Sequence, residues 1–160
     1  MINLSKVKNV TTKHFIGEIP KDGGEVEYFR LAEGILEVGG ENEEETEEFA
    51  YYSGDGTSQT EVMSVKKNHP FEGHFIASDP AQKMIDDREF ATGDESKIMY
   101  KQERSDGKVL EGPATLNNVI VTGGPADEYR PISGVISWDQ KPEITKKGDD
   151  SDDGGGGVEG

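Results

Sequence analysis

The residues of this sequence that could do chemistry are few, and their spacing does not suit a reactive site. His69 and His74 stand five positions apart in a stretch with a strand pattern, and His14 is remote in sequence. Strand residues an odd number of positions apart point to opposite faces, so His69 and His74 cannot bind one metal ion together. The chain has no cysteine, which excludes disulfides, cysteine-ligated metals and a cysteine nucleophile. We therefore expect the three histidines to be ordinary exposed strand residues.

Two acidic, glycine-containing motifs resemble ligand-binding loops but lack an essential part of each. Residues 149–154, DDSDDG, are similar to the start of a calcium loop, but Gly160 occupies the position of the bidentate glutamate. Residues 54–56, GDG, lack the lysine and the helix of a phosphate-binding loop. Adjacent carboxylates such as Asp86 and Asp87 carry little information in a chain with 33 acidic residues. The sequence predicts no catalytic residue, no metal site and no cofactor, so we do not expect an enzyme.

Composition and charge restrict the class of protein. The 160 residues suit one domain with extensions, and 31% hydrophobic against 31% charged residues predicts a modest core. A formal net charge of −16 argues against a tight nucleic-acid groove, which needs a basic surface. No apolar run approaches the roughly 20 residues of a membrane span, and the N-terminus lacks the apolar region of a signal peptide. We expect the protein to be made and kept in a cytoplasm.

A strand followed by one short helix is the best-marked local feature. Residues 65–77 have the alternation of a strand, and a helix is expected over about residues 80–90. Asp79 is a favourable N-cap, Pro80 suits the first helical position, and Gly93 is expected to end the helix. The apolar positions of this unit that we assign to the core are Phe71, Phe75, Met84 and Ile85.

Further strand patterns surround this unit. Residues 96–104 and a strand leaving from Val109 flank Asp106-Gly107, a strong hairpin signal. Residues 131–138 alternate most regularly, and their expected core positions are Ile132, Ile136 and Trp138. We count seven to nine strands and one helix. The predicted fold is all-β, a sandwich or barrel with one short helix on its flank.

The segment 39–61 is unusual because it contains eight acidic residues and no lysine or arginine. Like-charge repulsion is expected to make it a poor helix and a poor strand, so we predict a long loop. Its aromatic residues are atypical of plain disorder. Two interpretations stay open: a solvated linker, or a loop that orders against a partner. In the second case the interface residues are Phe49, Tyr51, Tyr52 and Asp55.

The two ends of the chain differ from the middle. Residues 1–13 alternate weakly, with lysines between the apolar positions, and could be an arm or an edge strand. Residues 147–160 are acidic, glycine-rich and of low complexity, so we expect a flexible tail. The predicted organisation is an N-terminal arm (1–13), a β-sandwich domain (14–146) and this tail. The apolar arm residues, assigned to an assembly interface, are Ile2, Leu4 and Val7.

The order of these segments resembles a known family. The similarity runs through RLAEGI, the acidic insert ending in AYYSGDGTS, and VKKNHPFEGHFIASDPAQKMI, then through VLEGPATLNNVIVTGG and ISGVISWDQKPEI. Together these look like the major tail proteins, or tail tube proteins, of long-tailed phages and prophages of Gram-positive bacteria. The resemblance covers residues 31–144 and rests on a pattern of segments. Some members of the family carry a C-terminal immunoglobulin-like domain, for which residues 147–160 are too short.

The resemblance implies a tail-tube fold related to the tube protein of type VI secretion, built from two packed β-sheets and a flanking helix. It also implies hexameric rings that stack into a tube, with long loops and terminal arms joining neighbouring rings. The implied partners are further copies of the chain, the tape-measure protein, and the tail terminator and distal tail proteins. DNA would pass through the tube without being bound. The implied location is the virion tail, with assembly in the host cytoplasm.

Two other functions remain compatible with the sequence. A monomeric β-sandwich module could bind carbohydrate or protein through Trp138, Tyr51 and Tyr52, and would have an ordered long loop and an exposed aromatic platform. A capsid or head-decoration protein would also self-associate, but would form caps or trimers in place of hollow rings.

Overall fold

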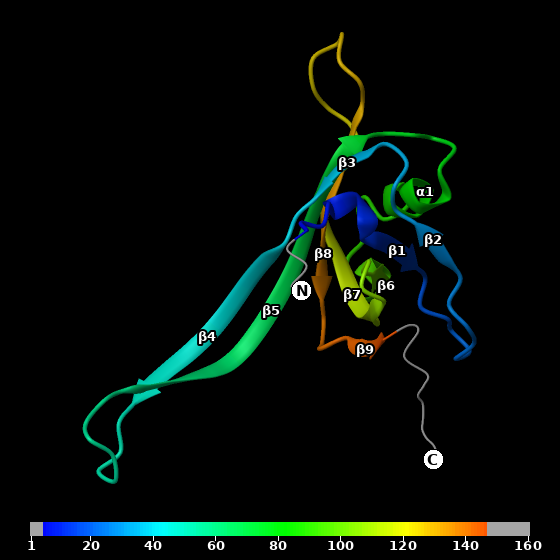
Figure 1. The fold of residues 1–160 in the computed structure, drawn as a ribbon. Coiled ribbons are helices and arrows are strands. Elements are labelled where there is room, and N and C mark those ends of the chain that lie inside the picture. Colours follow the sequence, from blue (N-terminus) through cyan, green and yellow to red (C-terminus); the bar gives the residue numbers. More distant parts are fainter. Residues whose placement is uncertain (1–4, 147–160) are drawn as a thin grey trace.

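The computed structural model describes residues 5–146 and shows a mostly β fold with one short α-helix, as the sequence predicted (Figure 1). Two short 3-10 helices, Asn9–Thr11 and Gly93–Ser96, accompany the helix α1 (Pro80–Asp86). No helix in this part of the chain is long and apolar enough to cross a membrane. The nine strands are β1 (Lys13–Gly17), β2 (Tyr28–Arg30), β3 (Ile35–Val38), β4 (Glu41–Phe49), β5 (Gln59–His74), β6 (Lys97–Glu103), β7 (Lys108–Ile120), β8 (Pro131–Trp138) and β9 (Glu143–Lys146).

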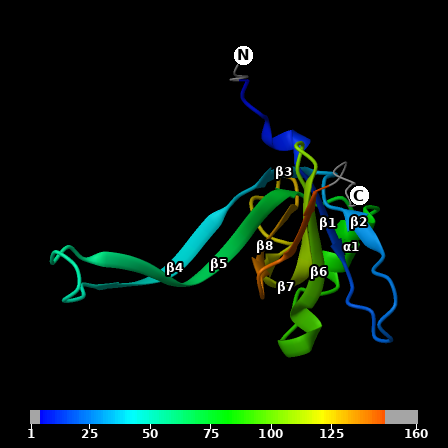
Figure 2. The ribbon, with the colours of Figure 1, turned by 60° about the horizontal axis from the view of Figure 1, so that its bottom comes forward.

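All strands join one antiparallel sheet in the order β2-β1-β6-β7-β8-β5-β3. Two strands lie off this path: β4 pairs with the first part of β5, and β9 pairs with the first residues of β7. The strands β1, β2, β6, β7 and β8 form a curved body with α1 beside it, and the β4–β5 hairpin projects far from that body (Figures 1 and 2).

Alternation of buried and half-buried side chains builds the core of the body. In β6 the buried residues are Ile98, Tyr100 and Gln102, and β8 repeats the pattern from Ile132 to Ile136, after which Ser137 and Trp138 are also buried. The helix α1 packs against β1, β2 and β7 through Ala81, Met84 and Ile85. Of the positions assigned to the core from the sequence, Phe75 is half-buried, and the buried ones are Phe71, Met84, Ile85, Ile132, Ile136 and Trp138.

The helix begins where its local sequence indicates but ends earlier than expected. The Asp79 side chain accepts a hydrogen bond from the Gln82 N–H at 3.0 Å, and Pro80 occupies the first turn. The helix ends at Asp86, and a series of turns follows to residue 90. Gly93, with φ of 56°, starts the second 3-10 helix and does not cap α1. The expected helix end at about residue 90 was therefore wrong by one turn.

One buried amide fastens α1 to the sheet. The Gln82 Nε2 donates to the carbonyl oxygens of Glu33 at 2.7 Å and His74 at 3.2 Å, and the Gln82 Oε1 accepts from the Ile76 N–H at 2.6 Å. Gln82 is fully buried, so these bonds satisfy polar groups that water cannot reach. They join the β2–β3 connection, the end of β5 and the helix at one point.

The strand predictions around the body are accurate except at one place. Asp106-Gly107 turns β6 into β7, with Gly107 at φ 93° and the Asp106 carboxylate accepting from the Lys108 N–H at 3.0 Å. The strand that leaves from Val109 is longer than its neighbours, because β7 runs through to Ile120. A shift in the pairing with β8, next to Asn118 at φ 54°, marks a bulge inside this long strand.

The prediction of an irregular loop over residues 39–61 was wrong for its first half. Residues 41–49 form the strand β4, paired with β5 along its whole length. Most glutamates of β4 lie opposite a residue that is not acidic, such as Lys66 for Glu43, and a single pair, Glu47 with Glu61, brings two acids together. Every glutamate of β4 is also exposed, so water screens the repulsion along the strand. The ladder therefore forms despite the charge.

Candidate self-assembly interface

The β4–β5 hairpin is a two-stranded ribbon that packs on nothing in the described part of the chain. β8 pairs with β5 only from Asn68 onward, so residues 59–67 of β5 have β4 as their one neighbour. All of these residues are exposed, as is β4 apart from Phe49. A two-stranded ribbon with no packed face is marginally stable in water. Its length and isolation make the hairpin the candidate interface of this structure.

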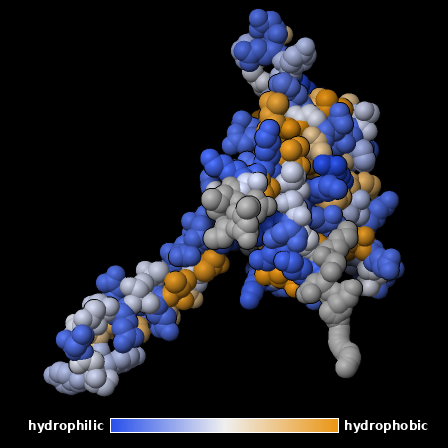
Figure 3. All heavy atoms as spheres, viewed as in Figure 1, coloured by the Kyte–Doolittle hydropathy of each residue, from blue (hydrophilic) through white to orange (hydrophobic). Residues whose placement is uncertain are grey.

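The register gives the two faces of this ribbon different chemistry. One face carries Glu41, Glu43, Glu45 and Glu47, and is strongly acidic. On the other face Val65 lies opposite Glu44 and Val62 opposite Thr46, so the two valines share a side. Val62, Met63 and Val65 are each more than half exposed, and hydrophobic atoms are visible along the projecting arm in Figure 3. The hairpin therefore offers an acidic face and a mixed acidic–apolar face.

The tip of the hairpin carries the aromatic residues assigned to an interface. The rings of Phe49 and Tyr51 meet edge to face with centroids 5.0 Å apart, while Tyr52 is fully exposed. The Asp55 carboxylate accepts from the Thr57 N–H at 2.9 Å, and this hydrogen bond lowers the pKa of Asp55. Asp55 therefore shapes the turn, whereas Tyr52 presents a large apolar surface to solvent.

The structure describes only part of the predicted N-terminal arm, residues 1–13. Val7 is exposed, and Ile2 and Leu4 lie outside the described residues, as does the segment 147–160. The described portion of 1–13 forms no strand before β1, and contains the 3-10 turn Asn9–Thr11.

A groove of about 790 Å³ lies at the base of the hairpin, where β5 leaves the sheet. Its apolar lining comes from Leu110, Trp138 and Ile144, and the wall on the hairpin side includes Val65. Four cationic side chains also line it: Lys66, Lys67, Arg104 and Lys141. The ion pairs among the described residues involve other cations, Arg88, Lys97 and Lys101. This basic groove is exceptional in a chain of net charge −16.

The sequence analysis did not single out these cations. One signal was available, because Lys66-Lys67 directly follows the segment 39–61, which has no basic residue. Arg104 and Lys141 have no sequence proximity to that pair and join it only through the pairing of β5, β7 and β9 around the β8–β9 turn.

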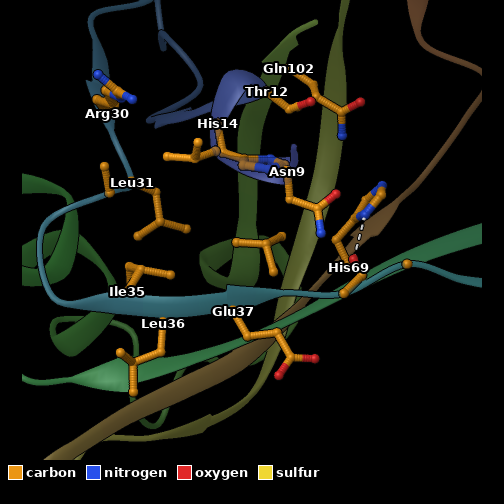
Figure 4. Close-up of a pocket in the computed structure, with 15 residues that line it drawn as sticks. Asn9, Thr12, His14, Arg30, Leu31, Ile35, Leu36, Glu37, His69 and Gln102 are labelled. Carbon is orange, nitrogen blue, oxygen red and sulfur yellow. Dashed lines mark hydrogen bonds between the residues drawn. The ribbon is translucent and has the colours of Figure 1, made fainter. Parts of the chain in front are cut away.

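Two histidines lie inside the body, which corrects the expectation that they are exposed. The rings of His14 and His69 are 6.5 Å apart beside a second cavity of about 430 Å³ (Figure 4). His69 Nδ1 donates to the Gly39 carbonyl oxygen at 2.9 Å, and His14 Nδ1 lies 2.6 Å from the Tyr100 hydroxyl. Only His74 is exposed as expected, against the ring of Tyr129.

Burial lowers the pKa of both histidines, although the hydrogen bond from His69 to Gly39 opposes the shift. The Gln102 Nε2 donates to the Tyr100 hydroxyl at 3.2 Å, which leaves the tyrosine proton free to bond His14 Nδ1. Burial lowers the pKa of His14 to about 4, with help from His69 and Arg30, and burial also lowers the pKa of His69. No group of three or more histidines or carboxylates suited to a metal occurs among the described residues. The cluster is a structural polar network of the core.

Comparison with known proteins gives a clear result at the level of structure alone. No family model and no curated protein sequence matches the chain. Its structure is similar to a chain from the tail of an empty gene transfer agent (GTA) particle refined with C6 symmetry, with a TM-score of 0.63, 12% identity, and coverage of 88% of this chain and 99% of that one. It is also similar to the SPP1 tail tube, with a TM-score of 0.62, 15% identity, and coverage of 90% and 80%.

A third similarity extends to a related assembly. A chain of the anti-feeding prophage baseplate matches with a TM-score of 0.52, 9% identity, and coverage of 91% of this chain and 98% of that one. Identities this low establish a shared fold. The protein therefore has the tube fold found in phage tail tube and baseplate proteins.

Proposed function

We propose that this protein is a virion structural protein that self-assembles into stacked hexameric rings, forming the tail tube of a long-tailed phage or prophage of Gram-positive bacteria. The observation that carries the proposal is the match of nearly the whole chain to chains of two phage-type tails, one of them refined with C6 symmetry. In this role the tube conducts the genome during ejection, and the protein is not an enzyme.

The two unpaired edges of the sheet support self-assembly. The sheet ends in β2 on one side and in β3 and β4 on the other, so neither border has a further strand in the described residues. Unpaired edges favour pairing with another chain unless they are covered. Pairing between the two different borders of neighbouring copies is a head-to-tail contact, which closes into a ring when its rotation allows.

The acidic surface suits a conduit for DNA. A net charge of −16 leaves few places where phosphates could gain affinity by counterion release. Acidic side chains that face the lumen would let DNA slide without binding. Tubes whose inner acids were replaced by lysine should eject more slowly, and an unchanged ejection rate would contradict this part of the proposal.

The proposed role also defines partners and location. The tape-measure protein would lie inside the tube during assembly, and the tail terminator and distal tail proteins would contact its two ends. The protein would be found in the virion tail, and in the host cytoplasm during assembly. These partners follow from the family resemblance and the shared fold, and are proposals for this chain.

One observation favours the alternative of a monomeric binding module. The β4–β5 ladder is complete within a single chain, as that alternative expects. Trp138 does not support it, because this ring is buried against Tyr100 with centroids 4.7 Å apart and forms no exposed platform.

Negative-stain electron microscopy of the concentrated, aged protein tests the proposal directly. Hollow rings or tubes with six-fold end views are the expected result. Caps or trimeric particles would favour a capsid or head-decoration protein. Particles that stay monodisperse at every concentration, with a rigid hairpin, would favour the binding module and contradict the tube.

A further inference from the structure

We propose that the basic groove at the base of the hairpin receives the distal half of the β4–β5 hairpin, residues 46–62, of a second copy. The inference rests on the proposed function, and it assigns the contact that joins neighbouring subunits. Three properties of the described residues carry it: charge, apolar surface and the position of the groove relative to its own hairpin.

The charges of the two surfaces are complementary. The groove gathers Lys66, Lys67, Arg104 and Lys141, and none of these cations takes part in an ion pair within residues 5–146. The distal half of the hairpin, residues 46–62, carries Glu47, Glu48, Asp55 and Glu61. A long exposed segment with no basic residue between positions 39 and 61 fits a site lined by unpaired cations.

Two acids, Glu41 and Asp139, line the groove beside its four cations. The Asp139 carboxylate accepts hydrogen bonds from Lys97 Nζ at 3.2 Å and from the Thr115 hydroxyl at 2.7 Å. Lys66 Nζ donates to the Trp138 carbonyl oxygen at 3.3 Å, and Arg104 Nε donates to the Gln102 side chain at 2.8 Å. Neither acceptor is a carboxylate, although Glu43 lies opposite Lys66 in the ladder and the charge of Arg104 helps to lower the pKa of Asp106. The four cations of the lining still outnumber its two acids, so the groove suits carboxylates from outside.

The apolar surfaces also match. The lining of the groove includes Leu110, Trp138, Pro142 and Ile144, and the hairpin exposes Val62, Met63 and Tyr52. Burying exposed apolar side chains against such a lining is favourable at about 25 cal/mol per Å². Charged groups around an apolar centre are the usual composition of a specific interface.

The position of the groove decides which copy supplies the hairpin. Lys66, Lys67 and Val65 belong to the base of the hairpin and form one wall of the groove. The distal half projects away from this wall (Figures 1 and 2), so it does not occupy its own groove. A hairpin that enters the next copy's groove leaves its own groove open for another, which is a heterologous contact. Repetition of this contact generates a ring or a filament.

The other acidic segment of the chain, 147–160, fits less well. It has the charge for the groove, but its sequence contains a single apolar residue, Val158, and its six glycines offer the apolar lining little. The hairpin supplies both charge and apolar surface, which is why we assign it as the occupant.

Disulfide trapping tests the contact cleanly because the chain has no cysteine of its own. We would combine Lys141→Cys with Glu48→Cys, Tyr52→Cys or Glu47→Cys in three double variants, and oxidise each full-length protein under assembly conditions. At least one pair is expected to give a ladder of covalent oligomers, and each single variant should give dimers at most. A cross-linked species that stops at the dimer in all three double variants would overturn the heterologous contact.

A charge exchange provides the second measurement. The groove variant Lys67→Glu/Lys141→Glu and the hairpin variant Glu47→Lys/Glu48→Lys should each raise the threshold concentration for assembly at least about tenfold. A 1:1 mixture should restore assembly, because each acidic hairpin then meets a basic groove and each basic hairpin an acidic one. The matched control, Lys21→Glu/Lys83→Glu, makes the same change in net charge at other exposed positions.

The outcomes separate this inference from the proposed function. Tubes that form normally with no ladder in any pair and no effect of the groove variant would overturn the inference and leave the tube intact. A disulfide within one chain in Lys141→Cys/Asp152→Cys, with no ladder in the other pairs, would assign the groove to segment 147–160. Failure of the unmodified protein to assemble at any concentration, with no ladder in any double variant, would overturn both.

Discussion

The body and the hairpin are built from the same antiparallel ladder but owe their order to different interactions. In the body, alternate residues of β6 and β8 are buried against α1 and the facing strands. In the hairpin, nearly every side chain is exposed and the ladder rests on backbone hydrogen bonds and cross-strand pairs. Backbone pairing alone is marginal in water, whereas apolar burial is the dominant stabilising contribution. The comparison shows that apolar burial within one chain holds the body, whereas the hairpin relies on its ladder alone.

The largest expected effect is the loss of a buried side chain in the body. Ile136 is fully buried in β8, so Ile136→Ala should lower the free energy of unfolding by about 3 to 4 kcal/mol. Val62→Ala in the hairpin, where the side chain is half exposed, should change it by less than about 0.5 kcal/mol. Urea unfolding of the monomer measures both. Equal effects at the two sites would contradict the division between body and hairpin.

The second effect concerns the amide that fastens α1 to the body. Gln82→Ala leaves the Ile76 N–H and two carbonyl oxygens without their partner, and should cost about 3 kcal/mol. The exposed helix residue Lys83 provides the control, since Lys83→Ala should be nearly neutral. Thermal unfolding compares the two variants. A Gln82→Ala protein as stable as the control would show that the amide is dispensable.

The third effect is a pH dependence that belongs to the body. The pKa of His14 is about 4 in the folded protein and near 6.5 when unfolded, so only the unfolded state takes up a proton between these values. Stability should be complete above pH 6.5 and fall as the pH drops toward 4, by about 2 kcal/mol after discounting partial exposure. His69, whose pKa is also lowered, contributes in the same direction.

Variants isolate the histidine responsible. His14→Gln retains an acceptor for the Tyr100 hydroxyl but cannot titrate, so its stability should depend less on pH than that of the unmodified chain. His74→Gln changes the exposed histidine and should leave the profile unaltered. Urea unfolding at several pH values between 4 and 8 provides the measurement. Identical slopes for all three proteins would contradict the assignment.

The smallest effect on monomer stability should accompany a clear effect on assembly. Tyr52 is fully exposed, so Tyr52→Ser should change the free energy of unfolding by less than about 0.5 kcal/mol. If the hairpin is an assembly surface, the same change should raise the threshold concentration for tubes, as judged by sedimentation. Phe90→Ser removes another exposed aromatic, beside α1, and serves as the control. Equal thresholds for both variants would argue against the hairpin tip.

Local sequence patterns predicted much of the body. The alternation in residues 131–138, the Asp106-Gly107 turn and the Asp79-Pro80 helix start each depend on neighbours a few positions away, and all three appear in the structure. The end of α1 was misjudged because apolar spacing continued to Phe90, a residue the structure leaves exposed. Gly93 satisfied the sequence rule for a helix end, yet its positive φ serves a later turn.

The candidate site was less predictable, because its chemistry depends on pairing between distant strands. Residues such as Glu43 and Glu44 suggested repulsion when considered within one segment, but β5 places Lys66 and Val65 opposite them. The groove was missed for the same reason. Its cations come from positions 66–67, 104 and 141, which no local pattern connects.

The sequence by itself determined the all-β class, the single short helix, the strongly acidic character and the exposed aromatic residues between positions 49 and 52. These properties follow from composition and from periodicity over a few residues. Only the tertiary structure decided that the acidic segment is a hairpin, that a basic groove lies at its base, and that His14 meets Tyr100, 86 positions away. Contacts between residues so far apart depend on which strands pair in the sheet. That pairing is determined by the free energy of the whole chain, which no local pattern contains.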